Sequence, residues 1–511
     1  MLLHQLLIDG ALRRPHRVAF HWIDRGRSLT YAEAALQMER FAGAISALGV
    51  KKGDRVTIVA HNGMDYLLTL FGCWRIGAIA ALVNVKFADE LEYYFTDHEP
   101  TIVVYTHDLG ADVRRAAAKT RSIRALVCMD GAQDGALSLP ALVQSAPPPP
   151  PDPGDEDAIA HLSYTSGTTG RPKAVCLAHE PTVRATRCIA ERLRLTRDDA
   201  FFGPTALSSS YQLVANLLPA LHHALTAAVM ARWTPEAGWQ KLEETGSTVL
   251  AGNPTLLSDV LAQSRLHGRT PRGLRLGLSG GGPVPLALKQ AWRDELKLPL
   301  VESYGQSELG GFVALGAPEL LPDERLAPVG RPLPDKEVRV LDEAGREVPV
   351  GEIGELCLRG GFMKGYWGAE QKTARTLRGG YLHTGDAGTV DVDGFVVMRG
   401  RYSELFQVGG RTWFPRDVEE AICACPGVRA AAVVGLPDTG LGNRPLAFVV
   451  LESTSPPLDA PALKSAVQSR LAYDLAPLEI VRLEEFPLTP TGKIAKAELR
   501  ERALARQTQE K

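Results

Sequence analysis

The most distinctive chemical feature of the sequence is a run of hydroxyl and glycine residues within HLSYTSGTTGRPKAVCLAH, residues 161–179. Glycines let the backbone approach an anion closely, while N–H groups and hydroxyls donate hydrogen bonds to phosphate oxygens and a lysine supplies countercharge. The run therefore predicts a loop that holds phosphate groups. Its members are Thr165, Ser166, Gly167, Thr168, Thr169, Gly170 and Lys173.

Two other interpretations of this run, a Walker A loop and an ordinary turn, are less well supported. A Walker A loop needs G-x-x-x-x-G-K-[ST], whereas here two residues separate Gly170 from Lys173. An ordinary flexible turn is the second alternative, but six Thr, Ser and Gly residues in a row before a Pro-Lys pair are uncommon in turns.

Three further places carry residues suited to nucleotide chemistry. In ESYGQSE, residues 302–308, an aromatic residue beside glycine can stack on a purine, while a hydroxyl and a carboxylate can reach phosphate and Mg²⁺. Asp386 in HTGD offers two acceptor oxygens for the two hydroxyls of a ribose. Lys493 follows Thr-Gly near the C-terminus. Taken singly, these are more often a strand-to-loop junction, a turn and a solvated lysine.

The segments that must position these residues alternate between helical and strand-like patterns. Residues 34–48 suit a helix and residues 55–60 a buried strand, and similar strand-like runs recur through PLVESYG at 299–305. This α/β alternation predicts a largely parallel sheet covered by helices. The proline-rich tract at 145–158 is expected to be a surface loop rather than a domain linker, since the alternation resumes after it.

The sequence pattern changes after about residue 330. Short alternating runs such as KEVRVLD, GREVPVG and GELCLRG predict antiparallel hairpins with Gly and Asp turns. Beyond Arg401, helices at 415–425 and 460–471 enclose two strands, which predicts a small α+β domain.

Composition excludes several classes of protein. The 511 residues carry 57 Lys+Arg and 59 Asp+Glu, a formal net charge of −2, so strong attraction to nucleic acid is not expected. Seven scattered cysteines make no disulfide framework, and Cys423 and Cys425 suit a small-residue core position better than a zinc site. No secretion signal or membrane span is expected, and a reducing cytoplasm fits.

The motifs together resemble those of the adenylate-forming enzymes, a family that includes acyl-CoA synthetases, adenylation domains and luciferases. SYTSGTTGRPKAV is joined, in the family's order, by SGGGPVP, ESYGQSE, GEIGELCLRG, YLHTGD, RGRYSELFQVGGRTWFPRDVE and PLTPTGKIAK. The resemblance covers residues 29–496. It implies a large N-terminal domain, residues 1–400, of parallel-rich helix-covered sheets plus a small distorted β-barrel, and a small mobile C-terminal α+β domain, residues 401–511.

The resemblance also implies roles for individual residues. Tyr304 would lie against adenine, Ser307 would contact the α-phosphate, and Glu308 would bind magnesium. Asp386 would bind the ribose, together with Arg401. The implied nucleotide-binding set is Thr165, Ser166, Gly167, Thr168, Thr169, Gly170, Lys173, Gly281, Gly282, Pro283, Glu302, Ser303, Tyr304, Gly305, Gln306, Ser307, Asp386, Arg401 and Lys493. The implied catalytic set is Lys493, Glu308 and Thr165.

The C-terminal part departs from the family pattern at two positions. Glu404 stands at the hinge, where relatives usually have Asp or Lys, and Gln407 replaces a common Lys. Gly409 and Gly410 match the pair that lets a pantetheine arm pass. By the same resemblance, the ammonium of Lys493 would neutralise the charge that develops as an acid attacks phosphorus.

The acid is harder to predict. Ser209 occupies the place of a histidine found in many relatives, and no aspartate lies between residues 201 and 213 to pair with an α-ammonium group. Amino acids are therefore disfavoured, and an aliphatic or aromatic acid without that group is expected. The predicted acyl and CoA pocket comprises Ser209, Tyr211, Asn253, Thr255, Gly281, Gly409 and Gly410.

The resemblance thus implies an ATP-dependent acid–thiol ligase that uses ATP, Mg²⁺ and CoA. It would form acyl-AMP from a small carboxylic acid and then transfer the acyl group to CoA. One alternative is a stand-alone enzyme that loads the phosphopantetheine of a separate acyl carrier protein. Another is a nucleotide sensor without activity, which the retained Lys493 and Glu308 disfavour. A homodimer is compatible with either enzyme.

Overall fold

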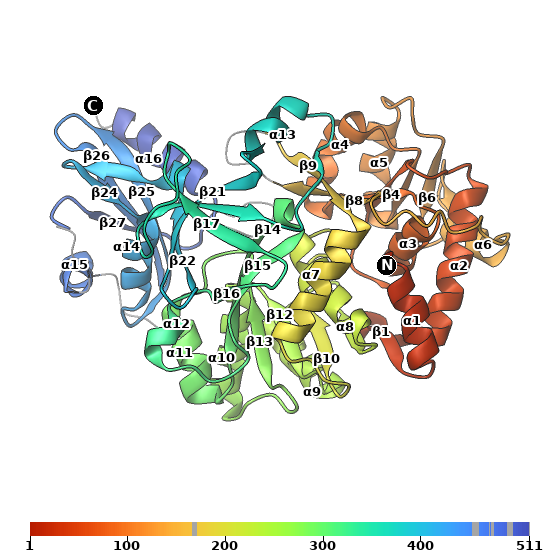
Figure 1. Ribbon diagram of the computed structural model, residues 1–511, viewed down its shortest axis with the longest axis horizontal. Helices are drawn as coiled ribbons and strands as arrows, with labels where there is room; N and C mark the ends of the chain where they lie inside the picture. The colour runs from red at the N-terminus through yellow and green to blue at the C-terminus, as the bar shows by residue number, and fades with distance from the viewer. Residues whose placement is uncertain (166–170, 452–458, 470, 472–474, 488–493, 510–511) are drawn as a thin grey trace.

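The computed structural model describes residues 1–165, 171–451, 459–469, 471, 475–487 and 494–509. Within them the chain forms four β-sheets. The N-terminal segments lie at one end of the molecule and the C-terminal segment, blue in Figure 1, lies at the other. Among the described helices, none combines the length and apolar character needed to cross a bilayer.

The first large sheet carries the predicted phosphate loop. Its strands run parallel from β8 to β7, and β9 and β19 add an antiparallel edge. In spatial order they are β19 (Gly365–Tyr366), β9 (Lys173–Ala178), β8 (Ile159–Thr165), β4 (Ile79–Leu82), β3 (Arg55–Val59), β5 (Ile102–Tyr105), β6 (Ala125–Cys128) and β7 (Leu137–Ser138).

The second large sheet carries the glycine-rich and aromatic motifs. Its central strands are parallel, while β15, β16 and β2 are antiparallel to their neighbours. In spatial order they are β16 (Arg331–Pro332), β15 (Gly311–Leu315), β14 (Leu300–Gln306), β13 (Leu276–Ser279), β12 (Val249–Gly252), β10 (Ala200–Gly203), β11 (Thr226–Val229), β1 (Val18–Trp22) and β2 (Arg27–Thr30).

Helices fill the space between these sheets and cover their outer faces. One apolar core joins the inner faces of both sheets through α1 (Gln5–Arg13), α2 (Tyr31–Ala47), α3 (Met64–Arg75), α7 (His179–Arg192) and α8 (Leu218–His222). The outer face of the first sheet carries α4 (Leu91–His98) and α5 (Gly110–Ala117). The second is covered by α9 (Pro235–Thr245), α10 (Pro254–His267) and α11 (Leu286–Ala291).

The predicted helix at 34–48 and strand at 55–60 are confirmed as α2 and β3. A capping box starts α2 three residues early: Thr30 N donates to Glu33 at 2.8 Å, and Glu33 N donates to the Thr30 hydroxyl at 3.3 Å. The proline-rich tract follows α6 (Leu139–Gln144) as a loop held on the first helices, where Arg75 donates to the Pro150 carbonyl at 3.1 Å.

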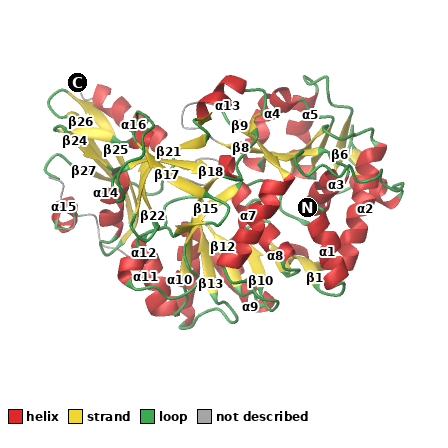
Figure 2. Cartoon of the chain, in the orientation of Figure 1, coloured by secondary structure: helices red, strands yellow, loops and turns green. Residues whose placement is uncertain are grey.

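The third sheet lies between the large sheets and the C-terminal domain (Figure 2). It is antiparallel and lies after residue 330, where antiparallel hairpins were predicted. Its strands are β17 (Glu337–Leu341), β18 (Gly354–Arg359), β21 (Tyr381–Val390), β20 (Leu377–Arg378) and β22 (Val396–Arg401). Residues 345–351, predicted as a strand, contribute only one isolated bridge, from Glu347 to Leu341. The short helices α12 (Asp323–Leu326) and α13 (Glu370–Thr376) flank this region.

The C-terminal residues form a separate α+β domain with its own apolar cores. The sheet consists of β24 (Arg411–Trp413), β23 (Phe406–Val408), β26 (Gly442–Leu451), β25 (Val428–Asp438) and β27 (Glu479–Arg482). Its helices are α14 (Pro415–Cys423), α15 (Ala460–Gln468) and α16 (Lys496–Gln509). The two helices predicted here are confirmed as α14 and α15, each ending two or three residues earlier than expected.

Replacing Gly305 by alanine is expected to destabilise the fold at β14. A Cβ at this position would lie 2.0 Å from the carbonyl oxygen of Gly311 on the paired strand, and backbone atoms cannot move aside cheaply. We expect a loss of about 1–3 kcal/mol in the free energy of unfolding, measured by urea denaturation. Gly282→Ala is the matched control, because a Cβ there meets no heavy atom within 4 Å. Equal stability of both variants would contradict the expectation.

Candidate active site

The two ends of the predicted phosphate loop lie opposite each other on paired strands. Thr165 ends β8 and Lys173 begins β9, and the two residues are partners in the antiparallel register. This pairing places Thr165 and Lys173 side by side at the edge of the first sheet. The intervening predicted residues lie outside the described part of the chain: Ser166, Gly167, Thr168, Thr169 and Gly170.

A tyrosine that the sequence did not single out joins Lys173 to Glu308. The Lys173 ammonium lies 5.2 Å from the centre of the Tyr366 ring, and the Tyr366 hydroxyl donates to a Glu308 carboxylate oxygen at 3.0 Å. Tyr366 is held in place by β19, where it pairs with Val175. Glu308 sits in a single 3₁₀ turn, Ser307–Leu309, that follows β14. The Tyr366 side chain therefore contacts the Lys173 ammonium through its ring and the Glu308 carboxylate through its hydroxyl.

The charge on Lys173 is easily lost. Partial burial and, to a lesser extent, the neighbouring Lys372 together lower the pKa of Lys173 to about 8, whereas Glu308 opposes the shift. Two ammonium groups near each other repel, so an anion between them would stabilise both. The edge of the sheet is thus suited to a polyanion.

The predicted purine and ribose residues meet around one carboxylate. Asp386 is buried, and one of its oxygens accepts from the Tyr304 hydroxyl at 2.7 Å and from the Gln306 amide at 2.6 Å. Its other oxygen lies 2.7 Å from Nε of Arg401. Arg401 is the register partner of Asp386 on β22. The third sheet and β14 therefore converge on Asp386.

Three serine hydroxyls lead from the first sheet to the predicted α-phosphate residue. Ser163 on β8 and Ser210 are 2.7 Å apart through their oxygens, and Ser210 donates to Ser307 at 3.1 Å. Only Ser307 was predicted from the sequence. The row of hydroxyls offers donors that can reorient to suit a ligand.

The glycine run 280–282 is open on one side and closed on the other. A Cβ at Gly280 would lie 2.2 Å from the Ser303 hydroxyl and 2.6 Å from the Tyr211 ring, so only glycine fits there. A Cβ at Gly281 or Gly282 would meet nothing within 4 Å. Gly281 also has φ +81°, a conformation that glycine adopts without strain. The run, followed by exposed Pro283, presents bare backbone beside an aromatic ring.

Tyr211 is fixed by the strands on which it rests. Its hydroxyl donates to the carbonyls of Leu278 at 2.7 Å and Gly252 at 3.1 Å, at the ends of β13 and β12. Its backbone N–H donates to the Ser209 hydroxyl at 3.2 Å. These bonds fix the Tyr211 ring, which makes it a rigid wall for the predicted acyl pocket.

The other predicted pocket residues have structural roles as well. The Asn253 side chain caps α10 by accepting from the Leu256 N–H at 2.9 Å, and Thr255 is exposed on the first turn of that helix. Ser303 donates to the Ser279 carbonyl at 2.8 Å. The place of Asn253 and Thr255 in an acyl pocket stays a prediction.

Glu302 lies in a buried ion-pair cluster that crosses between the two domains. Its carboxylate is 2.5 Å from Nζ of Lys289 and 3.5 Å from a guanidinium nitrogen of Arg416, which belongs to α14 of the C-terminal domain. All three side chains are less than a tenth exposed. Arg416 is also paired with Glu420 at 2.7 Å. Sequence reasoning placed Glu302 at the nucleotide and could not show this interdomain contact.

The predicted hinge residue is held by a lysine from the last helix. Nζ of Lys496 lies 2.8 Å from Glu404 and 2.8 Å from Glu419. Burial alone would lower the pKa of Lys496, but Glu419 and Glu404 raise it above its ordinary value. Gly409 and Gly410, with φ +57° and +79°, form the two-residue turn between β23 and β24. Lys493 lies outside the described residues.

A model of AMP-binding enzymes matches residues 8–367, and a model of the AMP-binding enzyme C-terminal domain matches residues 417–493. The chain belongs to the AMP-binding enzyme family. It is therefore an adenylate-forming enzyme, an AMP-forming acid–thiol ligase of the acyl-CoA synthetase type. ATP or AMP and CoA are the nucleotides that such an enzyme uses.

Three similar proteins extend this family assignment over the whole chain. A feruloyl-CoA synthase from Amycolatopsis sp. is 32% identical over 97% of this chain and 98% of its own. A fatty acid–[acyl-carrier-protein] ligase from Streptomyces coeruleorubidus is 31% identical over 93% of this chain and 92% of its own. The crystal structure of a benzoate CoA ligase from Burkholderia xenovorans LB400 is 26% identical, with a TM-score of 0.88 over 98% of this chain and 99% of its own.

The low pKa of Lys173 predicts that ATP use declines at alkaline pH. Below about pH 8 the Lys173 side chain is an ammonium, and above it the charged fraction falls, roughly fivefold between pH 8 and pH 9. We expect kcat/KM for ATP to fall with the charged fraction, measured as pyrophosphate release. Lys173→Arg should remove this fall, and Lys372→Ala should move it to higher pH. A wild-type profile that is flat from pH 7 to pH 9 would contradict this role.

The contact between Arg416 and Glu302 is expected to stabilise the observed arrangement of the two domains. Arg416→Met keeps most of the apolar stem and removes the guanidinium. A double-mutant cycle with Glu302→Gln, followed by urea denaturation, should give a coupling energy of about 1 kcal/mol. The cycle subtracts the effect of Glu302→Gln on Lys289. Additive effects of the two substitutions would show that the contact contributes nothing.

Proposed function

We propose that the enzyme activates an aromatic carboxylic acid as its acyl-AMP and transfers the acyl group to CoA. The main support for an aromatic acid is the glycine run 280–282, which presents bare backbone next to the fixed ring of Tyr211. Gly280 packs directly against the Tyr211 ring, whereas the open sides of Gly281 and Gly282 leave room for a flat ring to lie on the backbone. The relatives named for feruloyl and benzoate groups support the same choice.

The pocket's polar groups fit an uncharged aromatic substituent better than an ammonium. The predicted wall offers the hydroxyl of Ser209 and the ring of Tyr211, and no carboxylate occurs in residues 201–213. An α-ammonium group would be left without a partner there, which costs free energy in a buried site. This supports the prediction that amino acids are poor substrates.

The adenylation step is assigned to residues that the fold brings to one place. The Lys173 side chain would bind the β- and γ-phosphates, and the Ser163–Ser210–Ser307 hydroxyls would orient the α-phosphate. Asp386 would accept from the ribose hydroxyls while Tyr304, Gln306 and Arg401 keep its carboxylate in position. The acid oxygen then attacks the α-phosphorus and pyrophosphate leaves. Positioning and fixed charges supply most of the acceleration in such transfers.

Glu308 is the residue that would hold Mg²⁺. A carboxylate oxygen is the ligand that this ion prefers, and the hydroxyl of Tyr366 donates to one of the two Glu308 oxygens. When bound, the ion neutralises charge on the phosphate oxygens. Thr165, at the end of β8, would add a hydroxyl donor to the same phosphates.

Thioester formation calls for a rotation of the C-terminal domain, with the boundary proposed at residues 400–401. Before it, Lys493 would neutralise the attacking carboxylate. After it, the Gly409–Gly410 turn would replace Lys493 at the site and admit the pantetheine arm. Glu404 is the proposed pivot, and the contacts that must change are those of Lys496 with Glu404 and of Arg416 with Glu302.

A panel of acids tests the proposed function. Benzoates, hydroxycinnamates and saturated fatty acids of several lengths would be compared by pyrophosphate release, and then by thioester formation with CoA or with an acyl carrier protein. We expect an aromatic acid to give the highest kcat/KM and CoA to be the acceptor. Preference for fatty acids with a carrier protein would instead support the second candidate, which the carrier-protein ligase relative favours. No pyrophosphate release with any acid would refute both.

Lys493→Ala is expected to separate the two half-reactions. Formation of acyl-AMP should fall by several orders of magnitude, because the substitution removes the cation that acts at the α-phosphate. Thioester formation from supplied acyl-AMP should be retained within a few-fold. Lys496→Ala is a useful comparison, since this lysine is near in sequence but bound to Glu404 and Glu419. Equal loss of both half-reactions in Lys493→Ala would contradict the assignment.

A further inference from the structure

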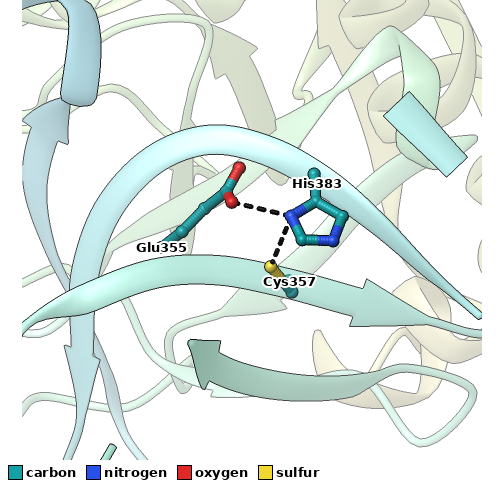
Figure 3. Close-up of side chains that lie close together, drawn as sticks. All are labelled: Glu355, Cys357 and His383. Atoms are coloured by element: carbon teal, nitrogen blue, oxygen red, sulfur yellow. Dashed lines mark hydrogen bonds and ion pairs between the residues drawn. The ribbon is translucent and has the colours of Figure 1, made fainter. Parts of the chain in front are cut away.

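Three potential metal ligands converge on one face of the third sheet (Figure 3). Glu355 and Cys357 come from β18, and His383 comes from the adjacent strand β21. Cys357 and His383 are direct register partners, and Glu355 lies two residues along the same strand face. Their donor atoms all lie within 4.8 Å of one another. None of the three was part of the predicted nucleotide or acyl site.

The donor atoms are in direct contact around the His383 ring. Nδ1 of His383 lies 2.7 Å from a Glu355 oxygen and 3.3 Å from Sγ of Cys357. The Glu355 side chain is 18% exposed and that of His383 is 9% exposed, while Cys357 is fully buried. The cluster is therefore sheltered but still open to solvent on the Glu355 side.

The chemistry of this set selects against magnesium. Mg²⁺ and Ca²⁺ take oxygen ligands, whereas a thiolate, an imidazole and a carboxylate are together the ligands of Zn²⁺. In a tetrahedral zinc site with bonds of 2.0 to 2.3 Å, neighbouring ligand atoms lie about 3.4 Å apart. The observed 3.3 Å already matches this spacing, and the 2.7 Å pair must open by about 0.7 Å.

We propose that Glu355, Cys357 and His383 bind one zinc-like divalent ion, with water as the fourth ligand. On binding, a metal–sulfur bond forms and the thiol proton passes to water, while the Nδ1 proton of His383 moves to the other ring nitrogen through solvent. Thiolate and carboxylate then neutralise the ion. The cluster then changes from one net negative charge to neutral, so the nearby guanidinium of Arg378, 3.6 Å from Glu355, faces a neutral site rather than a cation.

The site would be coupled to the nucleotide site through Glu355. Its second oxygen accepts from the N–H of Gly385 at 2.9 Å, and Gly385 immediately precedes Asp386. Gly385 has φ +70°, so this bond holds a turn of the strand that only glycine adopts easily. Binding of an ion to Glu355 and His383 would thus fix the backbone on both sides of the turn that presents Asp386.

Cobalt titration of the full-length protein tests the proposal. Co²⁺ is used as the probe because thiolate ligation gives a charge-transfer absorption band that hydroxyl and carboxylate ligands do not. We expect one Co²⁺ per chain with this band, loss of the band on adding Zn²⁺, and no change with excess Mg²⁺. Cys357→Ser should abolish the band. Cys423→Ser, at a half-buried cysteine of α14, is the matched control and should keep it.

Glu355→Gln provides a second variant should Cys357→Ser fail to fold. Loss of one of three protein ligands should weaken Co²⁺ binding at least tenfold while the sulfur band persists at saturation. Absence of the band in the wild-type protein, its persistence in Cys357→Ser, or its loss in Cys423→Ser would each overturn the assignment. The result is independent of which acid the enzyme activates.

Discussion

The hydrogen bond from Tyr304 to Asp386 joins two parts of the chain that are 82 residues apart and belong to different sheets. Tyr304 comes from the long β14, and Asp386 from β21 of the third sheet. A buried carboxylate must be paired, and here Tyr304, Gln306 and Arg401 do so together. This requirement decides where the third sheet can lie against β14. The bond thereby sets the position of the proposed nucleotide acceptors relative to the phosphate-binding edge.

Charge is distributed unevenly over the site. At the phosphate edge, Lys173 and Lys372 lie close with Glu308 as the opposing charge, an arrangement that a polyanion would stabilise. At the domain junction, by contrast, Glu302 is already matched by Lys289 and Arg416. The first cluster is suited to binding a ligand, and the second to holding protein segments together. Because the charge of Glu302 is already matched by protein groups, Glu302 is not among the residues proposed to bind the nucleotide.

The sequence predicted the elements well where the signal is local. Periodicity and capping residues act within one segment, so α2, β3 and α14 appear close to their expected bounds. The phosphate loop was also predicted from consecutive residues; Thr165 and Lys173 are paired on β8 and β9, while its central residues lie outside the described part of the chain and its role stays a prediction. Residues 345–351 were predicted wrongly as a strand, because alternation alone does not supply a pairing partner.

Contacts between distant segments could not be predicted from the sequence. Tyr366 acts on Glu308 across 58 residues, and Ser163 meets Ser210 across 47. Ser163 begins the motif SYTSGTTGRPKAV, but nothing in the sequence pairs it with Ser210, and Tyr366 lies outside the motifs, so only the fold brings these pairs together. The paired cluster around Glu302 was missed for the same reason, since Arg416 comes from another domain.

The double ion pair of Lys496 bears on how the hinge can turn. Glu404, the proposed pivot, is paired with this lysine at 2.8 Å. Since Lys496 contacts both Glu404 and Glu419, a rotation that releases one carboxylate would still leave the partly buried ammonium neutralised by the other. The proposed rotation would thus exchange two salt bridges for one and would leave no ammonium without a partner. A glutamate at the proposed pivot is compatible with a low barrier to rotation for that reason.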